Sequence, residues 1–336
     1  MKQTTATNHS MKDLVANFPK QLQEALNIAQ AAKISAPKKI DNILITGLGG
    51  SGIGGTNVAE LAIKIATVPV TISKDYFIPG FVSENTLVIV CSYSGNTEET
   101  ISAMQQAMQK KAQFVCITSG GKVKEIAEQH KYDLIVIPGG FPPRSCIGYS
   151  LVQLLHVFEA KQIANLHYKK EVEAAIALLI EKEADIKQKA KTFADKLHNK
   201  IPVIYSLGNT EGLAVRFRQQ INENSKMLCW HHVIPEMNHN ELVGWAGGNK
   251  NLAVCVLRTS YDYERNVTRL EINKEIFSKY TDTVFDIVAE GNSPLVQALY
   301  LIHLTDWVSC YLADLKNIDP TEVKVIDFLK GALAKV

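Results

Sequence analysis

Short apolar runs rich in β-branched residues alternate along the first half of the chain with segments whose apolar positions recur at helical spacing. The apolar runs occupy residues 42–49, 68–73, 86–92, 112–118 and 133–138. The segments of helical pattern occupy residues 10–33, 51–66, 97–110 and 122–130. Runs that stay apolar, rather than alternating with polar residues, are typical of parallel strands covered by helices on both faces. The first half of the chain is therefore predicted to form a doubly wound α/β domain.

The same alternation restarts in the second half, after a long helical stretch. Residues 150–199 keep a helical pattern, and we interpret their charged part, 169–192, as a solvated helical connection. The strand-like runs and helical segments that follow occupy residues 201–208, 210–228, 252–258, 262–279, 282–288 and 294–316, and a last helix is predicted over 319–335, opened by Pro320. The predicted fold class is α/β, with two doubly wound domains of parallel sheet. Their predicted bounds are 1–160, with a leading helix, and 161–336, with a C-terminal helix.

Length and composition agree with two ordinary globular domains. The chain has 336 residues, of which 46% are hydrophobic, and its formal net charge is only +2. So small a charge produces no field that would attract nucleic acid or an anionic membrane. No apolar run approaches the roughly 18 residues that a membrane span needs, and the N-terminal segment lacks the apolar centre of a signal peptide. We therefore expect a cytoplasmic protein that binds neither nucleic acid nor membrane.

The six cysteines are scattered and mostly lie in apolar runs, so free buried thiols explain them better than disulfides do. One group of residues, Cys229, His231, His232 and His239, contains the side-chain types that bind zinc. The spacing of this group fits no zinc pattern. We expect no metal there.

A glycine-rich turn, Gly47–Gly55, follows the first predicted strand and opens the next helix. Such a turn lets an anion approach the free backbone N–H groups at a helix start. Its glycines also match G-x-G-x-x-G, the pattern of dinucleotide-binding domains, for which Asp75 is the only nearby acidic residue that could hold a ribose. Glycines that serve only to reverse the chain are a third interpretation.

A second polar segment, SYSGNT at residues 92–97, stands at the end of another predicted strand, again before a helix. Its hydroxyls and the helix N–H groups could form a cradle for an oxyanion, which a dinucleotide site does not need. Alternatively, Ser94 or Thr97 is simply the N-cap of the helix. Two such loops at strand ends of one sheet favour a phosphorylated small molecule, because open α/β sheets bind their ligands there.

These two loops resemble those of the sugar isomerase (SIS) domain, a phosphosugar-binding fold. The resemblance is carried by GLGGSG at 47–52 and SYSGNTEET at 92–100. Further segments make the chain similar to the bifunctional phosphoglucose/phosphomannose isomerases: PRS with Gly148 at 143–148, NENSK at 222–226, PEMNHN at 235–240 and IDFLK at 326–330. The resemblance implies two SIS-like domains of flavodoxin type, which the motifs from 47 to 330 span.

The resemblance also implies an activity, the interconversion of glucose 6-phosphate and mannose 6-phosphate with fructose 6-phosphate through a cis-enediolate, without cofactor or metal. It assigns proton transfer to Glu223, stabilisation of the intermediate to Arg144, and ring opening to His239 with Lys330. Phosphate binding falls to residues of the two loops, namely Gly50, Ser51, Ser92, Ser94 and Thr97. The residue types suit this chemistry, because the proton needs one base that can return it and histidine titrates in the right range.

From sequence alone, most of these residues also have a plainer interpretation. Glu223 shares a polar helix face with Arg216 and Gln220, and such a face is usually solvated. Arg144 could form a structural salt bridge, and Lys330 could be an ordinary surface lysine.

Two places depart from the family pattern. Val323 stands where family members can carry a threonine that is proposed to make room for both sugar epimers, so the mannose activity is less secure than the glucose activity. The segment SCIGY at 145–149 replaces alanine-rich versions. Neither departure touches Glu223.

Two other functions stay open at this stage. One is a regulatory SIS protein that binds a sugar phosphate without catalysis, and the other is an NAD-dependent oxidoreductase based on Gly47–Gly52. A regulatory protein would need no base. The resemblance further implies a homodimer in which His239 reaches the site of the neighbouring subunit.

Overall fold

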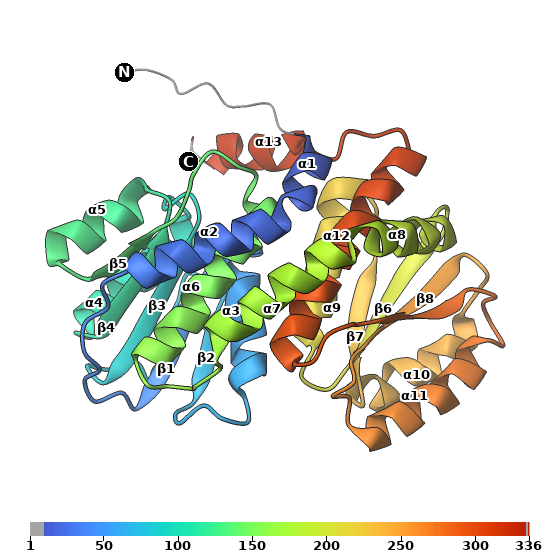
Figure 1. Cartoon of the computed structure of the whole chain (residues 1–336), viewed down its shortest axis with the longest axis horizontal. Helices are drawn as coiled ribbons and strands as arrows, with labels where there is room; N and C mark the ends of the chain where they lie inside the picture. Colours follow the sequence, from blue (N-terminus) through green and yellow to red (C-terminus); the bar gives the residue numbers. More distant parts are fainter. Residues whose placement is uncertain (1–9, 334, 336) are drawn as a thin grey trace.

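Two parallel sheets form the framework of the protein, as the computed structural model shows for residues 10–333 and 335 (Figure 1). Residues 1–9 of the N-terminal segment considered for a signal peptide, and the outer ends of the two predicted domains, lie outside these described residues. The first sheet has the strand order β2-β1-β3-β4-β5. Its strands are β1 (Asn42–Thr46), β2 (Val70–Ser73), β3 (Thr86–Ser92), β4 (Gln113–Thr118) and β5 (Asp133–Val136).

The second sheet repeats this arrangement with one strand fewer, in the order β7-β6-β8-β9. Its strands are β6 (Ile201–Leu207), β7 (Trp230–Ile234), β8 (Leu252–Arg258) and β9 (Val284–Val288). In both sheets the first strand in sequence lies between the second and the third, which is the flavodoxin-type order. The predicted class, two doubly wound α/β units with parallel sheets, is confirmed.

Helices cover both faces of the first sheet, because its strands are apolar on both sides. Side chains such as Ile45 and Ile89 face α2 (Phe18–Ala31), α3 (Gly49–Ala62) and α6 (Ile147–Ala160). Neighbouring side chains such as Leu44 and Val88 face α4 (Glu98–Gln109) and α5 (Gly121–His130). This two-sided burial explains why the strands read as continuous apolar runs.

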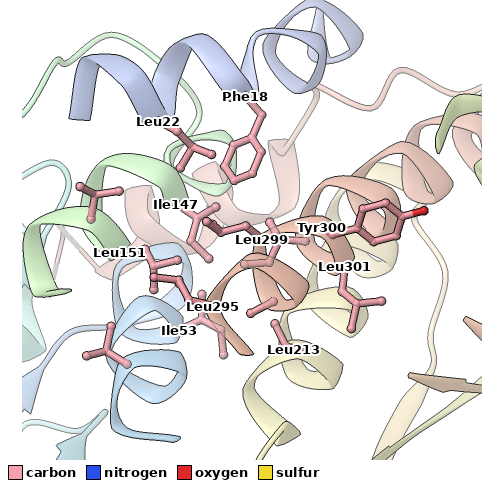
Figure 2. Close-up of a cluster of buried hydrophobic side chains, with 14 of the residues drawn as sticks. Phe18, Leu22, Ile53, Ile147, Leu151, Leu213, Leu295, Leu299, Tyr300 and Leu301 are labelled. Atoms are coloured by element: carbon pink, nitrogen blue, oxygen red, sulfur yellow. The ribbon is translucent and has the colours of Figure 1, made fainter. Parts of the chain in front are cut away.

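One hydrophobic core joins the two halves of the chain (Figure 2). Ile53 of α3 and Ile147 of α6 belong to the same buried cluster as Leu213 of α9 (Glu211–Ser225) and Leu299 of α12 (Pro294–Leu315). Burying one such side chain stabilises a fold by about 1.5–3 kcal/mol. The stability of each half therefore depends on the other half.

The helical stretch predicted over 150–199 is three helices: α6, α7 (Tyr168–Glu181) and α8 (Glu183–Leu197). Its charged part is not merely a solvated connection. Both α7 and α8 pack against α12, and Ile186 and Ala190 of α8 are fully buried. One face of α8 is charged and exposed while the other is part of the core.

Further differences from the predicted elements concern boundaries and short pieces. The helix predicted over 10–33 is divided at Asn17 into α1 (Met11–Ala16) and α2. Strand β7 was not predicted, because its sequence, WHHVI, carries two histidines. Three short helical pieces follow it, η2 (Glu236–His239), α10 (Glu241–Gly244) and η3 (Trp245–Gly247), before α11 (Glu264–Phe277) covers the second sheet.

The last helix, α13 (Lys324–Leu333), begins four residues after Pro320, which does not open it. No side chain of α13 is buried, and its apolar residues Val325 and Phe328 are 82% and 78% exposed. Within the described residues, no helix is long and apolar enough to cross a membrane.

Candidate active site

The two polar loops lie side by side at the carboxyl edge of the first sheet, because β1 and β3 are paired neighbours. The loop after β1 leads into α3, and the loop after β3 leads into α4. The backbone N–H of Tyr93 donates to the hydroxyl oxygen of Ser51 at 3.0 Å, which joins the two loops directly. The helix N–H groups of both loops therefore open onto one place, as an anion site requires.

The hydroxyls of the second loop face each other and the loop backbone. The Ser92 hydroxyl donates to the Thr97 hydroxyl at 3.1 Å and accepts from the Gly95 N–H at 3.1 Å. Thr97 is the N-cap residue of α4, but its side chain makes no capping bond. Capping therefore does not account for the Thr97 hydroxyl. Ser94 is exposed and accepts from the Asn96 N–H at 3.2 Å.

Two glycines allow this close assembly. A Cβ atom on Gly95, whose φ is +70°, would stand 1.8 Å from the carbonyl oxygen of Gly120. A Cβ atom on Gly50 would stand 2.9 Å from the carbonyl oxygen of Pro143. At Gly50 the absence of a side chain brings the N-terminus of α3 against the loop that carries Arg144.

Gly50, Ser51, Ser92 and Pro143 line one small pocket between these loops. A larger pocket, of about 430 Å³, lies elsewhere, between α3 and β2, and none of the predicted site residues lines it. Its one carboxylate, Glu60, accepts from the N–H of Gly212, and burial raises the pKa of Glu60 to about 7. Position relative to the sheet edge, rather than size, identifies the small pocket as the candidate site.

Arg144 stands beside this pocket in a short 3₁₀ turn, η1 (Pro143–Ser145), and is only 4% exposed. Its Nη1 lies 3.3 Å from Oε2 of Glu223, and its Nε donates to Oδ1 of Asn224 at 2.7 Å. Its Nη2 donates to the carbonyl oxygens of Pro320 at 2.6 Å and Thr321 at 3.1 Å. One side chain thus connects the first domain, α9 and the segment before α13.

These contacts use only part of the hydrogen-bonding capacity of the Arg144 guanidinium. A guanidinium has five N–H donors, and the described residues accept from four of them, two at Nη2 and one each at Nε and Nη1. One N–H on Nη1 is left beside Glu223. Burial lowers the pKa of Arg144, and the carboxylate of Glu223 opposes that effect. The group stays charged, because an arginine begins with a pKa above 12.

The polar face of α9 is buried, contrary to the solvated face that sequence favoured. Arg216 is 2% exposed, Gln220 is 1% exposed and Asn224 is fully buried. Arg216 donates to Asp306 of α12 at 2.6 Å and to the carbonyl oxygen of Arg144 at 3.1 Å. The face points at α12 and at the Arg144 loop because these elements supply polar partners inside the core. Glu223 lies at its edge with a side chain 31% exposed.

Sequence reasoning did not assign a role to Arg216, Asn224 or Asp306. A usable signal was present for two of them, since Arg216 and Asn224 are eight positions apart on one helix face and thus share the face of Glu223. Asp306 gave a different signal. It is an isolated carboxylate inside the apolar run of α12, where burial demands a partner.

His239 and Lys330 are not joined to this arrangement within the chain. His239 is exposed at the end of η2, near the end of β7 in the second sheet, and Lys330 is exposed on α13. Among residues 10–333, no hydrogen bond or ion pair connects either residue to Glu223. The structure therefore brings together Arg144, Glu223 and the phosphate loops, but not the two residues predicted to open the ring.

The structure does not favour the interpretation of the glycine-rich turn as a dinucleotide site. The strand order of the first sheet is that of flavodoxin-type folds, not the 3-2-1-4 order that begins a dinucleotide-binding sheet. Asp75 is exposed and accepts from its neighbour's N–H, that of Tyr76. In the part of the chain that the structure describes, no three His, Cys, Asp or Glu side chains are grouped to hold a metal ion.

The fold and the paired loops define a protein built of SIS domains, and comparison with known families agrees. Residues 38–139 match the SIS domain family, and residues 186–333 match the family described as the bacterial phospho-glucose isomerase C-terminal SIS domain. The C-terminal domain of glucosamine-fructose-6-phosphate aminotransferase from Francisella tularensis has a similar fold, with a TM-score of 0.75 and 14% identity. That likeness covers 96% of this chain and 100% of the other.

Relatives of known name narrow the assignment. The chain is 40% identical to the bifunctional phosphoglucose/phosphomannose isomerase of Caldicellulosiruptor bescii, over 97% of this chain and 99% of that protein. It is 38% identical to the protein of the same name from Aquifex aeolicus, over 90% of this chain and 93% of that protein. The chain belongs to the family of bifunctional phosphoglucose/phosphomannose isomerases.

Proposed function

We propose that the protein interconverts glucose 6-phosphate with fructose 6-phosphate, and mannose 6-phosphate with fructose 6-phosphate, by a proton transfer that needs no metal. The observation that carries this proposal is the contact between Arg144 and Glu223, 3.3 Å apart, beside the two phosphate loops. A base and a cation at this distance suit a reaction that moves one proton and creates one negative charge.

In the proposed reaction, Glu223 removes the proton from C2 of the open-chain aldose, and the electron pair of that C–H bond forms the C1–C2 double bond of a cis-enediolate. The remaining N–H on Nη1 of Arg144 donates to the oxygen that becomes negative. The hydroxyl proton on O2 of the enediolate moves to O1, and Glu223 returns its proton to C1 as the C2=O carbonyl of the ketose forms. A cation already held in place by Asn224 and two carbonyl oxygens needs no reorganisation when the charge develops.

The phosphate group of the substrate is proposed to bind between the two loops. The start of α3, at Gly50 and Ser51, and the hydroxyls of Ser92, Ser94 and Thr97 would hold it. Neither α3 nor α4 has a side-chain cap, so N–H groups of both first turns are available to an anion. Local hydroxyls and amides explain how a chain of net charge +2 holds a dianion.

Ring opening is proposed to use His239 from a second copy of the chain, together with Lys330. Two observations support a homodimer. His239 is exposed and lies in the second sheet's loops, where no contact of its own chain places it at Glu223. Val325, Phe328 and Leu329 form an exposed apolar face on α13, the helix that carries Lys330, and such faces commonly mark an interface. A homodimer would cover that face.

We also place the reaction in the cytoplasm. All six cysteines are free thiols, and all but Cys229 are buried. Free thiols persist in a reducing compartment.

The test is a coupled assay of fructose 6-phosphate formation, run with a metal chelator, on the native chain and on Glu223→Gln. We expect chelator-resistant turnover that falls by about 10²–10⁴ when the base is removed. Glu211→Gln is the matched control, since it makes the same change at the other end of α9 and should leave the rate within about twofold. Undiminished activity in Glu223→Gln would remove Glu223 from its role. Binding of sugar phosphate without any turnover would instead identify a regulatory protein.

A further inference from the structure

Arg144 is held by a closed ring of buried hydrogen bonds that involves three separate parts of the chain. Its Nε donates to Oδ1 of Asn224 at 2.7 Å, and Nδ2 of Asn224 donates to the hydroxyl of Ser309 at 2.9 Å. The Ser309 hydroxyl donates to the carbonyl oxygen of Asp306 at 2.7 Å. The Asp306 carboxylate accepts from Arg216 at 2.6 Å, and Arg216 also donates to the carbonyl oxygen of Arg144 at 3.1 Å.

We propose that this ring positions Arg144 for catalysis, and that Asn224 and Ser309 are positioning residues of the reaction, a role that rests on the proposed isomerase function. The ring fixes both ends of Arg144. Arg216 holds its backbone carbonyl, and Asn224 holds its Nε. With Nη2 bound to the carbonyls of Pro320 and Thr321, only the Nη1 edge faces Glu223.

Ser309 fixes the Asn224 amide on the side opposite Arg144. An asparagine amide has an oxygen on one side and an NH₂ group on the other, and only the oxygen can accept from Arg144. The Ser309 hydroxyl is already donating to Asp306, so it offers a lone pair to Asn224 and therefore selects its NH₂ side. The Nε–H of Arg144 and the Ser309 hydroxyl both require this orientation; without Ser309 the amide is held only by Arg144 itself and can shift together with the guanidinium.

Because the ring is buried, each of its hydrogen bonds matters for the position of Arg144. Asn224 and Ser309 are fully buried, and Arg216 and Asp306 are 2% and 5% exposed. Water therefore offers these groups no easy substitute for a lost partner. Deleting the Ser309 hydroxyl should change the orientation of Arg144 without touching the phosphate loops.

Ser225 offers a matched control on the same pair of helices. Its hydroxyl donates to the backbone carbonyl oxygen of Ser309 at 2.8 Å, so it also joins α9 to α12 by a buried hydrogen bond. It is fully buried, and it is not part of the ring. Ser225→Ala and Ser309→Ala therefore delete equivalent groups, and only Ser309→Ala opens the ring.

The experiment measures kcat and KM for fructose 6-phosphate in the native chain, Ser309→Ala and Ser225→Ala. We expect Ser309→Ala to lower kcat about tenfold with KM within about twofold, because substrate binding is unchanged while the transition state is less well stabilised. Ser225→Ala should stay within about twofold in both constants, although both variants lower the thermal midpoint. Equal kcat in the two variants, reduced or not, would overturn the positioning role.

A second readout does not depend on activity. The side-chain Nε–H signal of Arg144 in ¹⁵N NMR, assigned by its loss in Arg144→Lys, should shift and exchange faster with solvent in Ser309→Ala but not in Ser225→Ala. An unchanged signal in Ser309→Ala would contradict the ring even in a folded variant. If the native chain turned over no sugar phosphate, the proposed function would fail, and this signal alone would decide whether the ring positions Arg144.

Discussion

At the scale of single residues, the site depends on how closely α3 approaches the Arg144 loop. Gly50 is the residue that permits this approach, because a Cβ atom there would stand 2.9 Å from the carbonyl oxygen of Pro143. Backbone cannot move aside as the end of a flexible side chain can. The same glycine belongs to the proposed phosphate site, so it serves both the packing of α3 and the binding of substrate.

We expect Gly50→Ala to lower kcat/KM for fructose 6-phosphate at least about tenfold, since small displacements of positioned groups cost that much. The added methyl group would push the Pro143–Ser145 turn, and Arg144 with it, away from Glu223. Gly80→Ala is the control, because Gly80 has open space around its Cβ position. Comparable steady-state constants for Gly50→Ala and the native chain would show that the approach of α3 does not matter for catalysis.

At the scale of residues, the sequence could predict only those features that depend on the identity of a side chain. Glu223 and Arg144 were named from motifs, and the structure places them together. The contacts from Arg144 to Pro320 and Thr321 could not be predicted, because their acceptors are backbone carbonyls, which every residue possesses. The solvated face expected for α9 was wrong for a related reason, since its buried partners lie on a distant helix.

At the scale of elements, α12 organises the molecule. It packs against α7, α8 and α9, and it supplies Asp306 and Ser309 to the ring around Arg144. Its burial on nearly every side explains its almost unbroken apolar sequence. The strands and the long helices were predictable because their periodicity reflects such burial. Strand β7 was not, since it lies at a sheet edge, is only partly buried and carries two histidines among its five residues.

The same helix carries a buried histidine that should make the fold sensitive to acid. His303 is 1% exposed, stacks on Phe18 of α2 and accepts from the indole N–H of Trp307 at 3.3 Å. Burial lowers the pKa of His303 from 6.5 to about 4. Below pH 6.5 the unfolded chain binds a proton at His303 and the folded chain does not, so stability is lost as the pH falls from 6.5 toward 4.

We expect protonation of this histidine to lower the free energy of unfolding by at most about 3.4 kcal/mol over that pH range, at about 1.36 kcal/mol per pH unit. Urea unfolding at pH 6.5 and pH 4.5 measures it. His303→Gln keeps an acceptor for Trp307 but cannot be protonated, so its stability should change less between the two pH values. Parallel pH dependence in the two proteins would show that another group is responsible.

At the scale of the whole molecule, the site is made by the union of the two halves. Arg144 belongs to the first sheet's loops, Glu223 belongs to α9, which follows the first strand of the second sheet, and one hydrophobic core continues between them. The sequence pattern predicted two parallel sheets, although it missed strand β7 of the second one. The division of the chain at residues 160 and 161 stays a prediction, and so does the homodimer.

A mixing experiment tests the proposed homodimer and its shared site together. Glu223→Gln and His239→Ala should each be nearly inactive alone. Co-refolded in equal amounts, half of the dimers would be hybrids with one intact site each, which should restore about a quarter of native activity. Activity no greater than the sum of the separate variants would show that His239 does not act across a subunit boundary.

The most direct measurement follows the proton itself. Glucose 6-phosphate labelled with deuterium at C2 is incubated with the native chain in ordinary water, and the products are followed by ¹H NMR. Because Glu223 is proposed to carry the proton between C2 and C1 in contact with solvent, we expect fructose 6-phosphate with deuterium partly moved to C1 and partly lost to water. In Glu223→Gln both processes should slow by at least about 10²-fold. Product that keeps all of its deuterium, even after long incubation, would contradict the enediolate route.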